Sequence, residues 1–247
     1  MDGTSNVIIC GIIAVFVAGV IKGLTGFGFS LAAVPFLVLL LGPRTAIPIV
    51  IVLNALTNIG LYLSVRKSVD LKRIRPLIIA GIVSVPVGMI LLLVLNVTVL
   101  KVIVGCTICI FAFAFLLGFK RQVNNEKRGF VAAGLLSGTL NGAISTGGPP
   151  VILFLSNQGD ARQPFRANLI AYFLFLSLAS VPIFLAGGLV TLAVTRYALI
   201  FFPALVLGAL VGSWLLHRVP EHTFRVVALL VVMAAGVISV LSSVGFM

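Results

Sequence analysis

Polar and glycine residues gather in two short stretches of an otherwise apolar chain. The second stretch, residues 141–150, has the sequence Asn-Gly-Ala-Ile-Ser-Thr-Gly-Gly-Pro-Pro. Its paired prolines interrupt a continuous helix but suit the first turn of a new one. We therefore expect the amides of Gly147 and Gly148 at a helix N-terminus, together with the hydroxyls of Ser145 and Thr146. Free N–H groups and the positive end of the helix dipole make such an N-terminus an anion site.

The first stretch, residues 22–30, offers similar groups. We expect the Thr25 hydroxyl and the amides of Gly26 and Gly28 near the end of a second half-helix, with Ser30 as its N-cap. Lys22 is the basic residue inside this apolar segment, and a charge there is expensive unless it faces a cavity, a partner or the membrane interface. Binding the anion and snorkelling to the interface both remain open for Lys22.

Long apolar runs must position these two stretches. Hydrophobic residues make up 61% of the 247 residues and charged residues 9%, whereas a soluble domain has roughly 25% charged residues. The sequence therefore predicts an all-α polytopic membrane protein. Six runs have the length of about 20 residues that a membrane-spanning helix needs. These predicted spans are 45–65, 76–95, 99–119, 167–190, 197–216 and 226–246.

The two polar stretches interrupt longer segments, 7–41 and 130–157. As single helices these segments would measure ~52 Å and ~42 Å, against a bilayer core of about 30 Å. Each segment is also too short for two complete spans joined by a turn. We therefore expect each to form a broken, re-entrant pair of half-helices that enters and leaves by the same face of the membrane.

An internal repeat organises the prediction into two halves, 1–121 and 122–247. Gly19-x3-Gly23-x2-Gly26 is similar to Gly134-x3-Gly138-x3-Gly142, and three predicted spans follow each broken segment. A unit with three crossings inverts its partner in the membrane, so we expect two inverted repeats. For Gly19, Gly134 and Gly138, close packing between helices is the alternative role.

The basic residues test this topology independently, because loops on the inner side of a membrane are enriched in Lys and Arg. With both broken segments re-entrant, 13 basic residues lie on one side and 3 on the other; if both segments span once, the split is 10 against 6. The re-entrant arrangement therefore fits better. It predicts that both termini lie outside the cell. The three residues on the outer side would be Arg44, Lys101 and Arg196.

Other polar residues lie within predicted spans. Asn168 and Tyr172 share one helix face and Arg166 lies just before them, so these three and Asn141 are further candidates for contacting an anion. Asn54, Asn58, Ser84, Ser177 and Ser180 are expected mainly to form hydrogen bonds between helices. All five acidic residues fall in the tail or in loops, which argues against a cation site inside the membrane.

Several function classes are disfavoured. The basic residues lie in short loops between apolar runs, which predicts topology and no binding of nucleic acid. Neither a nucleotide-binding motif nor a catalytic metal motif occurs, and we expect no enzyme activity, no cofactor and no metal. An intramembrane hydrolase would need a base near Ser145, yet His217 and His222 lie in a distant predicted loop. We also expect no removable signal peptide.

The chain resembles the sulfite exporter TauE/SafE family over nearly its whole length. The resemblance is most specific in 141–151, in Arg166-Ala167-Asn168-Leu169 and in Tyr172-Phe173. The stretch Gly23-Leu24-Thr25-Gly26-Phe27-Gly28 with Pro35 is similar to the family's first motif, but Phe29 and Ser30 follow it where many members carry a tighter run of glycines. The resemblance implies transport of small sulfur-containing anions across the cytoplasmic membrane.

These observations predict a multi-pass secondary transporter in the inner cell membrane, which carries sulfite or an organosulfonate by alternating access. Its expected partners are the small anion and the lipid bilayer, and a homodimer is the assembly that we consider. A passive anion channel remains the nearer alternative. The predicted site combines residues of both breaks with the candidates in the spans: Lys22, Thr25, Gly26, Gly28, Ser30, Asn141, Ser145, Thr146, Gly147, Gly148, Arg166, Asn168 and Tyr172.

Overall fold

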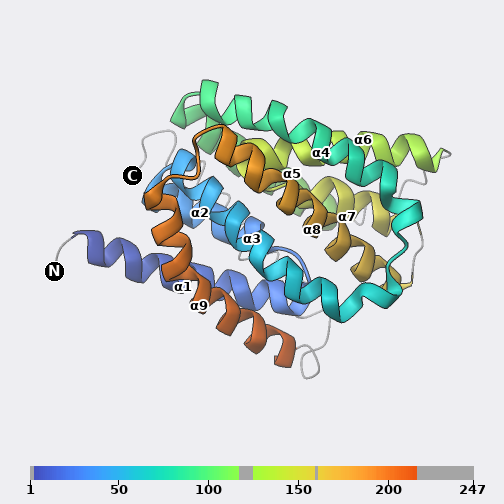
Figure 1. Ribbon diagram of the computed structural model, residues 1–247, viewed down its shortest axis with the longest axis horizontal. Coiled ribbons are helices and arrows are strands. Elements are labelled where there is room, and N and C mark those ends of the chain that lie inside the picture. The colour runs from blue at the N-terminus through green and yellow to red at the C-terminus, as the bar shows by residue number, and fades with distance from the viewer. Residues whose placement is uncertain (1–2, 117–124, 159–160, 216–247) are drawn as a thin grey trace.

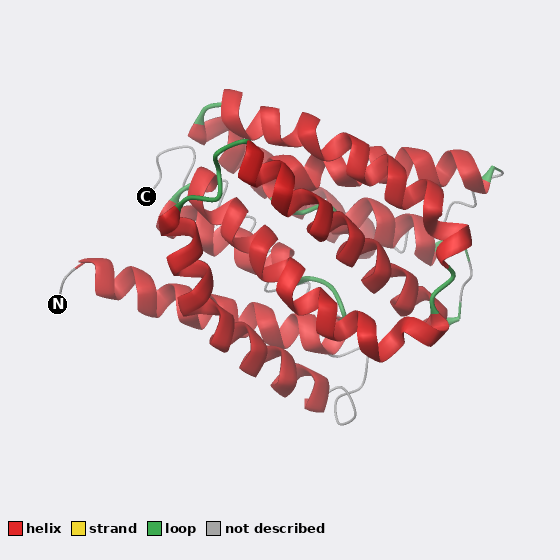
Figure 2. Cartoon of the chain, viewed as in Figure 1, coloured by secondary structure: helices red, strands yellow, loops and turns green. Residues whose placement is uncertain are grey.

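The computed structural model describes residues 3–116, 125–158 and 161–215, and these residues are helical apart from short loops (Figure 2). They form nine α-helices and one short 3₁₀ helix, η1, in an all-helical bundle (Figure 1). The elements are α1 Gly3–Thr25, α2 Phe29–Leu41, α3 Pro43–Val65, η1 Arg66–Ser68, α4 Leu71–Val94, α5 Val97–Leu116, α6 Glu126–Ile144, α7 Gly148–Ser156, α8 Arg162–Ala186 and α9 Leu192–Leu215.

Five of the described helices are long and apolar enough to cross a membrane. They are Ser5–Thr25, Pro43–Ser68, Leu71–Val94, Gln163–Ala186 and Leu192–Leu215. Four of them contain most of the predicted spans 45–65, 76–95, 167–190 and 197–216, and α5 covers most of 99–119. The predicted span 226–246 lies outside the described residues. Many large apolar side chains on these helices are exposed, as expected for surfaces that contact lipid.

Both predicted helix breaks are present. In the first, α1 ends at Thr25 and α2 begins at Phe29, and Gly26 and Gly28 adopt positive φ angles of 81° and 91°. In the second, α6 ends at Ile144 and Ser145 takes a left-handed conformation with φ 54°. The helices around each break are unequal, since α1 has 23 residues and α2 has 13. Helix α1 is longer than the half-helix expected in 7–41 and is long and apolar enough to cross a membrane.

Glycine contacts join each broken segment to a helix of the other half of the chain. A Cβ atom at Gly23 of α1 would overlap the carbonyl oxygen of Ala209 in α9. A Cβ at Gly142 of α6 would overlap the carbonyl oxygen of Val85 in α4, which precedes Ala209 by 124 positions. Only glycine allows backbones to approach so closely. The glycines for which close packing was the alternative role have contacts of the same kind: Gly19 with Leu205, Gly134 with Leu77 and Gly138 with Gly81.

The same contacts give a register for comparing the two halves. A Cβ at Gly19 would lie 2.8 Å from the carbonyl oxygen of Leu205, and one at Gly138 would overlap that of Gly81, again 124 positions earlier. Gly19 thus matches Gly138, and Gly23 matches Gly142. The alignment made from the sequence matched Gly19 with Gly134, one helical turn away. Spacing alone could not choose between successive glycines that repeat every four residues.

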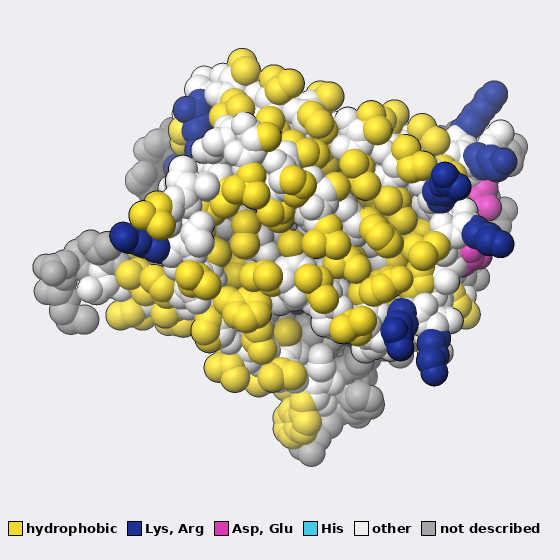
Figure 3. All heavy atoms as spheres, in the orientation of Figure 1, with side chains coloured by type: hydrophobic (Ala, Val, Ile, Leu, Met, Phe, Trp, Pro, Cys, Tyr) yellow, Lys and Arg dark blue, Asp and Glu magenta, His cyan; other side chains and the backbone are white. Residues whose placement is uncertain are grey.

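Basic side chains gather at two opposite ends of the bundle, and apolar side chains cover the surface between them (Figure 3). Helix α3 runs from Arg44 at one end to Val65 at the other, where η1 carries Arg66 and Lys67, and α4 returns. We call the second end, with residues 66–75, 126–128 and 163–166, the basic end. At the opposite end, Arg44 donates a hydrogen bond to the carbonyl oxygen of Leu93 over 2.8 Å, which ties the start of α3 to the end of α4.

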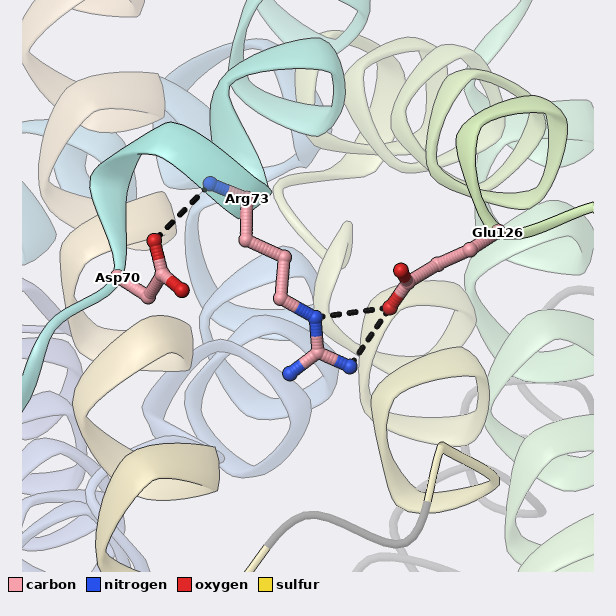
Figure 4. A network of polar contacts seen from close by, with 3 residues as sticks. All are labelled: Asp70, Arg73 and Glu126. Atoms are coloured by element: carbon pink, nitrogen blue, oxygen red, sulfur yellow. Dashed lines mark hydrogen bonds and ion pairs between the residues drawn. The ribbon is translucent and has the colours of Figure 1, made fainter.

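An ion pair joins two helix starts at the basic end (Figure 4). Arg73 of α4 binds Glu126 of α6 through Nη2 and Nε, at 2.6 and 2.8 Å from the same carboxylate oxygen. Asp70 caps α4 by accepting a hydrogen bond from the Arg73 amide, and its own amide donates to Asn168 Oδ1 in α8. The starts of α4, α6 and α8 therefore lie together.

Candidate functional site

The two breaks meet around one small internal pocket. Residues 26–31 of the first break and residues 145–148 of the second both line it, although more than 110 positions separate them in the sequence. Helices α3 and α8 close the sides with Asn54, Asn58, Phe173, Leu176 and Ser177. The prediction that the breaks face each other is thus consistent with the geometry. The predicted site residues that line the pocket are Lys22, Gly26, Gly28, Ser30, Asn141, Ser145, Thr146, Gly147 and Gly148.

Lys22 lies in this pocket and is only 2% exposed. Its ammonium group donates to Asn54 Oδ1 over 2.9 Å and to the Thr57 hydroxyl, both on α3. It also lies 5.5 Å from the centre of the Phe29 ring, within the range of a cation–π interaction. All of these groups are uncharged. The lysine therefore does not snorkel to an interface, and its charge has no counter-charge among the described residues that line the pocket.

Ser145 and Thr146 present polar groups that the protein leaves unused. Each residue is 1% exposed and lines the pocket. Within the described part of the chain, neither hydroxyl has a hydrogen-bond partner. A buried hydroxyl without a partner costs about 1–3 kcal/mol, so such groups are rare in native structures without water or a ligand to satisfy them. Two adjacent examples facing one pocket suggest a ligand with oxygen acceptors.

The glycines of the second break have different surroundings. A Cβ at Gly147 would overlap the carbonyl oxygen of Ser137, so the fold itself requires glycine there. A Cβ at Gly148 would meet only ordinary contacts, 3.5 Å from Ile152 and Phe173. Helix α7 begins at Gly148 with prolines in its first turn, as predicted. Gly148 therefore leaves room beside the pocket, while Gly147 permits close packing of the break.

The two breaks present equivalent positions to the pocket. The amide of Gly26 donates to the carbonyl oxygen of Lys22 over 2.7 Å, and the amide of Ser145 donates to that of Asn141 over 2.9 Å. In both cases the donor has a positive φ angle and ends the helix. The Asn141 side chain donates to Ser180 of α8, much as Lys22 donates to Asn54 of α3. Asn141 thus occupies in the second break the place of Lys22 in the first.

Four predicted site residues do not line the pocket. Thr25 uses its hydroxyl locally, on the carbonyl oxygens of Ile21 and Phe27. Asn168 is fully buried, but its side chain accepts from the Asp70 amide near the basic end. Arg166 is not among the lining residues but lies against Gly26, where a Cβ on that glycine would be 2.9 Å from Arg166 Nε.

Tyr172 is the fourth, and it acts through another residue. Its hydroxyl donates to Ser137 Oγ over 2.7 Å, and Ser137 donates to the carbonyl oxygen of Gly147. This chain of hydrogen bonds connects α8, α6 and the second break. Tyr172 therefore supports the wall of the pocket without lining it, so the expectation that it contacts the anion is not supported by its position.

The structure also corrects the role given to Ser30. Helix α2 begins at Phe29 after Gly28, and no side chain caps it. Ser30 instead accepts a hydrogen bond from Asn54 Nδ2 over 2.8 Å and lines the pocket. The glycine-rich break allows the chain to enter α2 in a left-handed conformation at Gly28, so Ser30 lies two positions too late to act as the cap.

Three pocket residues were expected from the sequence mainly to form hydrogen bonds between helices: Asn54, Asn58 and Ser177. Asn58 Nδ2 lies 3.4 Å from Ser177 Oγ, and the pair bridges α3 and α8. A signal was available, since Asn54 and Asn58 are one turn apart in an apolar span and share a face. The pair Asn168 and Tyr172 has the same spacing, and the sequence favoured that pair because Arg166 lies just before it.

The described residues that line the pocket include no group typical of catalysis. None of them is a histidine or carries a carboxylate, and the described part of the chain contains no group of three His, Cys, Asp or Glu that could hold a metal ion. Its lining consists of one ammonium group, hydroxyls, amides and apolar side chains. Such a lining can bind a small polar or anionic solute but offers no general base.

Apolar helices of membrane-spanning length around a buried polar pocket define a multi-pass membrane transport protein. The family model for the sulfite exporter TauE/SafE matches residues 11–238, nearly the whole chain. The chain therefore belongs to the TauE/SafE family, whose members are membrane transporters and not enzymes. Searches of curated proteins and of solved structures found no match.

Proposed function

We propose that this protein carries a small sulfur oxyanion, sulfite or an organosulfonate, across the cytoplasmic membrane, and that it binds the anion in the pocket between the two breaks. The observation that carries the proposal is the pair of buried, unpartnered hydroxyls of Ser145 and Thr146 facing the same pocket as the Lys22 ammonium group. Hydroxyl donors and one cation form a suitable set for an oxyanion.

The direction of the chain supports re-entrant segments. Helix α6 begins at the basic end, where Glu126 pairs with Arg73. Helix α7 leads back to the same end, where Gln163 at the start of α8 donates to Ser68 Oγ over 3.1 Å. Segment 126–156 would thus enter from the basic end, turn inside the bundle and leave by that end. Under the positive-inside rule the basic end is cytoplasmic and both termini are outside.

The matched glycine contacts of α1 with α9 and of α6 with α4 support two inverted repeats, 1–121 and 122–247. The broken segment of each repeat would pack against a helix of the other repeat, α1 against α9 and α6 against α4. Small relative movements of these two pairs could open the pocket to one side or the other, which is how inverted repeats produce alternating access around a fixed site. We include this mechanism in the proposal.

The experiment measures anion binding and flux with purified protein. Ser145→Ala and Thr146→Val remove one hydroxyl each and should weaken the affinity for sulfite or methanesulfonate about 5- to 150-fold, since each hydrogen bond to the anion contributes roughly 1–3 kcal/mol. Neither hydroxyl bonds within the described protein, so the melting temperature should stay the same or rise. Ser156→Ala, at the exposed end of α7, is the matched control and should keep wild-type affinity.

Flux into proteoliposomes then separates a transporter from a channel. A coupled transporter accumulates the anion against its gradient when a driving ion gradient is imposed, whereas a passive channel only equilibrates it. Wild-type affinity in both hydroxyl variants, for an anion that the wild-type protein transports, would place the site elsewhere.

A further inference from the structure

We propose that the pocket is selective for monovalent oxyanions over divalent ones, and that the single charge of Lys22 sets this selectivity. The inference rests on the proposed function and narrows its substrate class to anions such as sulfonates and hydrogensulfite. It follows from a count of charges around the pocket and from the equivalence of Lys22 and Asn141.

The charge count is simple. Lys22 is the one charged side chain among the described residues that line the pocket, and no carboxylate lines it. The neighbours of its ammonium group are an amide, a hydroxyl and an aromatic ring. Arg166 is not among the lining residues, although its Nε lies close to Gly26.

A buried charge is stable only when an opposite charge or strong dipoles compensate it. One monovalent anion beside Lys22 gives a neutral pair inside the bundle. A divalent anion of the same size leaves one uncompensated negative charge, which the hydroxyls of Ser145 and Thr146 and the α7 N-terminus compensate only in part. Because the surroundings are apolar, this difference favours the monovalent anion strongly.

The second break shows where a further charge would act. Asn141 lines the same pocket at the position equivalent to Lys22, one turn before the left-handed residue that ends its helix. A lysine there would add a second cation to the pocket. Selectivity for anion charge should therefore depend on how many of these two positions carry a lysine.

Methanesulfonate and sulfate are the probes, because both are tetrahedral and of similar size but carry one and two charges at pH 7. Their affinities should be measured by competition on purified, monodisperse protein. Wild type should prefer methanesulfonate by at least about 10-fold. Lys22→Arg should keep that preference, and Lys22→Met should bind methanesulfonate at least about 10-fold more weakly.

Moving the charge gives the sharper comparison. Asn141→Lys should shift the ratio of the two affinities toward sulfate by at least about 10-fold. The double variant Lys22→Asn with Asn141→Lys restores one cation and should return the preference for methanesulfonate. Lys67→Met is the matched control, since it removes an exposed lysine at the basic end, and it should not change the ratio.

Three results would overturn the inference while leaving the proposed function in place: equal wild-type affinity for both probes, an unchanged ratio in Asn141→Lys, or loss of preference in Lys22→Arg. Failure of the proposed function has a different signature. In that case the affinities for both probes would be insensitive to Ser145→Ala and Thr146→Val as well as to every change at position 22.

Discussion

The hydroxyl of Tyr172 lies 2.7 Å from Ser137 Oγ, and through Ser137 it reaches the carbonyl oxygen of Gly147 in the second break. Both side chains are fully buried, and neither lines the pocket. Tyr172 on α8 thus helps to hold the second break, which follows α6, in position. We therefore expect its effect on the proposed anion binding to be indirect.

Tyr172→Phe should weaken anion affinity about 2- to 12-fold, because a net contribution of roughly 0.5–1.5 kcal/mol from one hydrogen bond is lost and the break is held less firmly. If Tyr172 acts through Ser137, the two changes are not independent. The double variant Tyr172→Phe with Ser137→Ala should then weaken affinity by clearly less than the product of the two single-variant fold changes. Tyr62→Phe, on α3, is the matched control. Full additivity would show that Tyr172 acts independently of Ser137.

Replacement by alanine should lower the stability of the protein at one of the two adjacent glycines of the second break but not at the other. Gly147→Ala places a Cβ against the carbonyl oxygen of Ser137 and should lower the free energy of unfolding by about 1–3 kcal/mol or prevent folding. Gly148→Ala meets only ordinary contacts and should fold with near wild-type stability. Melting temperatures in detergent measure the contrast. Equal loss of stability in both variants would contradict the geometry of this break.

The ion pair at the basic end should matter little for anion binding. Arg73 and Glu126 have side chains that are 27% and 43% exposed, so their pairing should contribute about 0.2–1 kcal/mol to stability and less at high salt. Glu126→Gln should therefore keep wild-type affinity for the anion, and so should Asp70→Asn. A folded variant of either kind that no longer binds would show that a carboxylate takes part in the site.

Topology can be tested with single cysteines in a background without native cysteines. Lys67→Cys at the basic end should react with a membrane-impermeant maleimide only after permeabilisation of cells. Leu192→Cys at the opposite end should react without it, because α9 begins there and the side chain is 69% exposed. A cysteine at position 3 should behave as Leu192→Cys does, since both termini are proposed to lie outside. The reverse pattern would invert the assigned orientation.

The sequence by itself determined the membrane class, most of the spans and the positions of both breaks. These features depend on local chemistry: about 20 apolar residues satisfy their backbone groups as a helix, and a Gly-Gly-Pro-Pro run cannot continue one. The anion-site expectation for Ser145 and Thr146 came from the same local reasoning, and both residues line the pocket. Lys22 was recognised as costly, although two environments for it remained open.

Only the tertiary structure decided which polar residues meet. Asn54 with Asn58 and Asn168 with Tyr172 are both pairs one turn apart on an apolar helix, and the sequence favoured the second pair. The structure places the first pair in the pocket and turns the second toward the basic end and Ser137. Spacing along a helix fixes which residues share a face, but the crossing of one helix with another fixes what that face contacts.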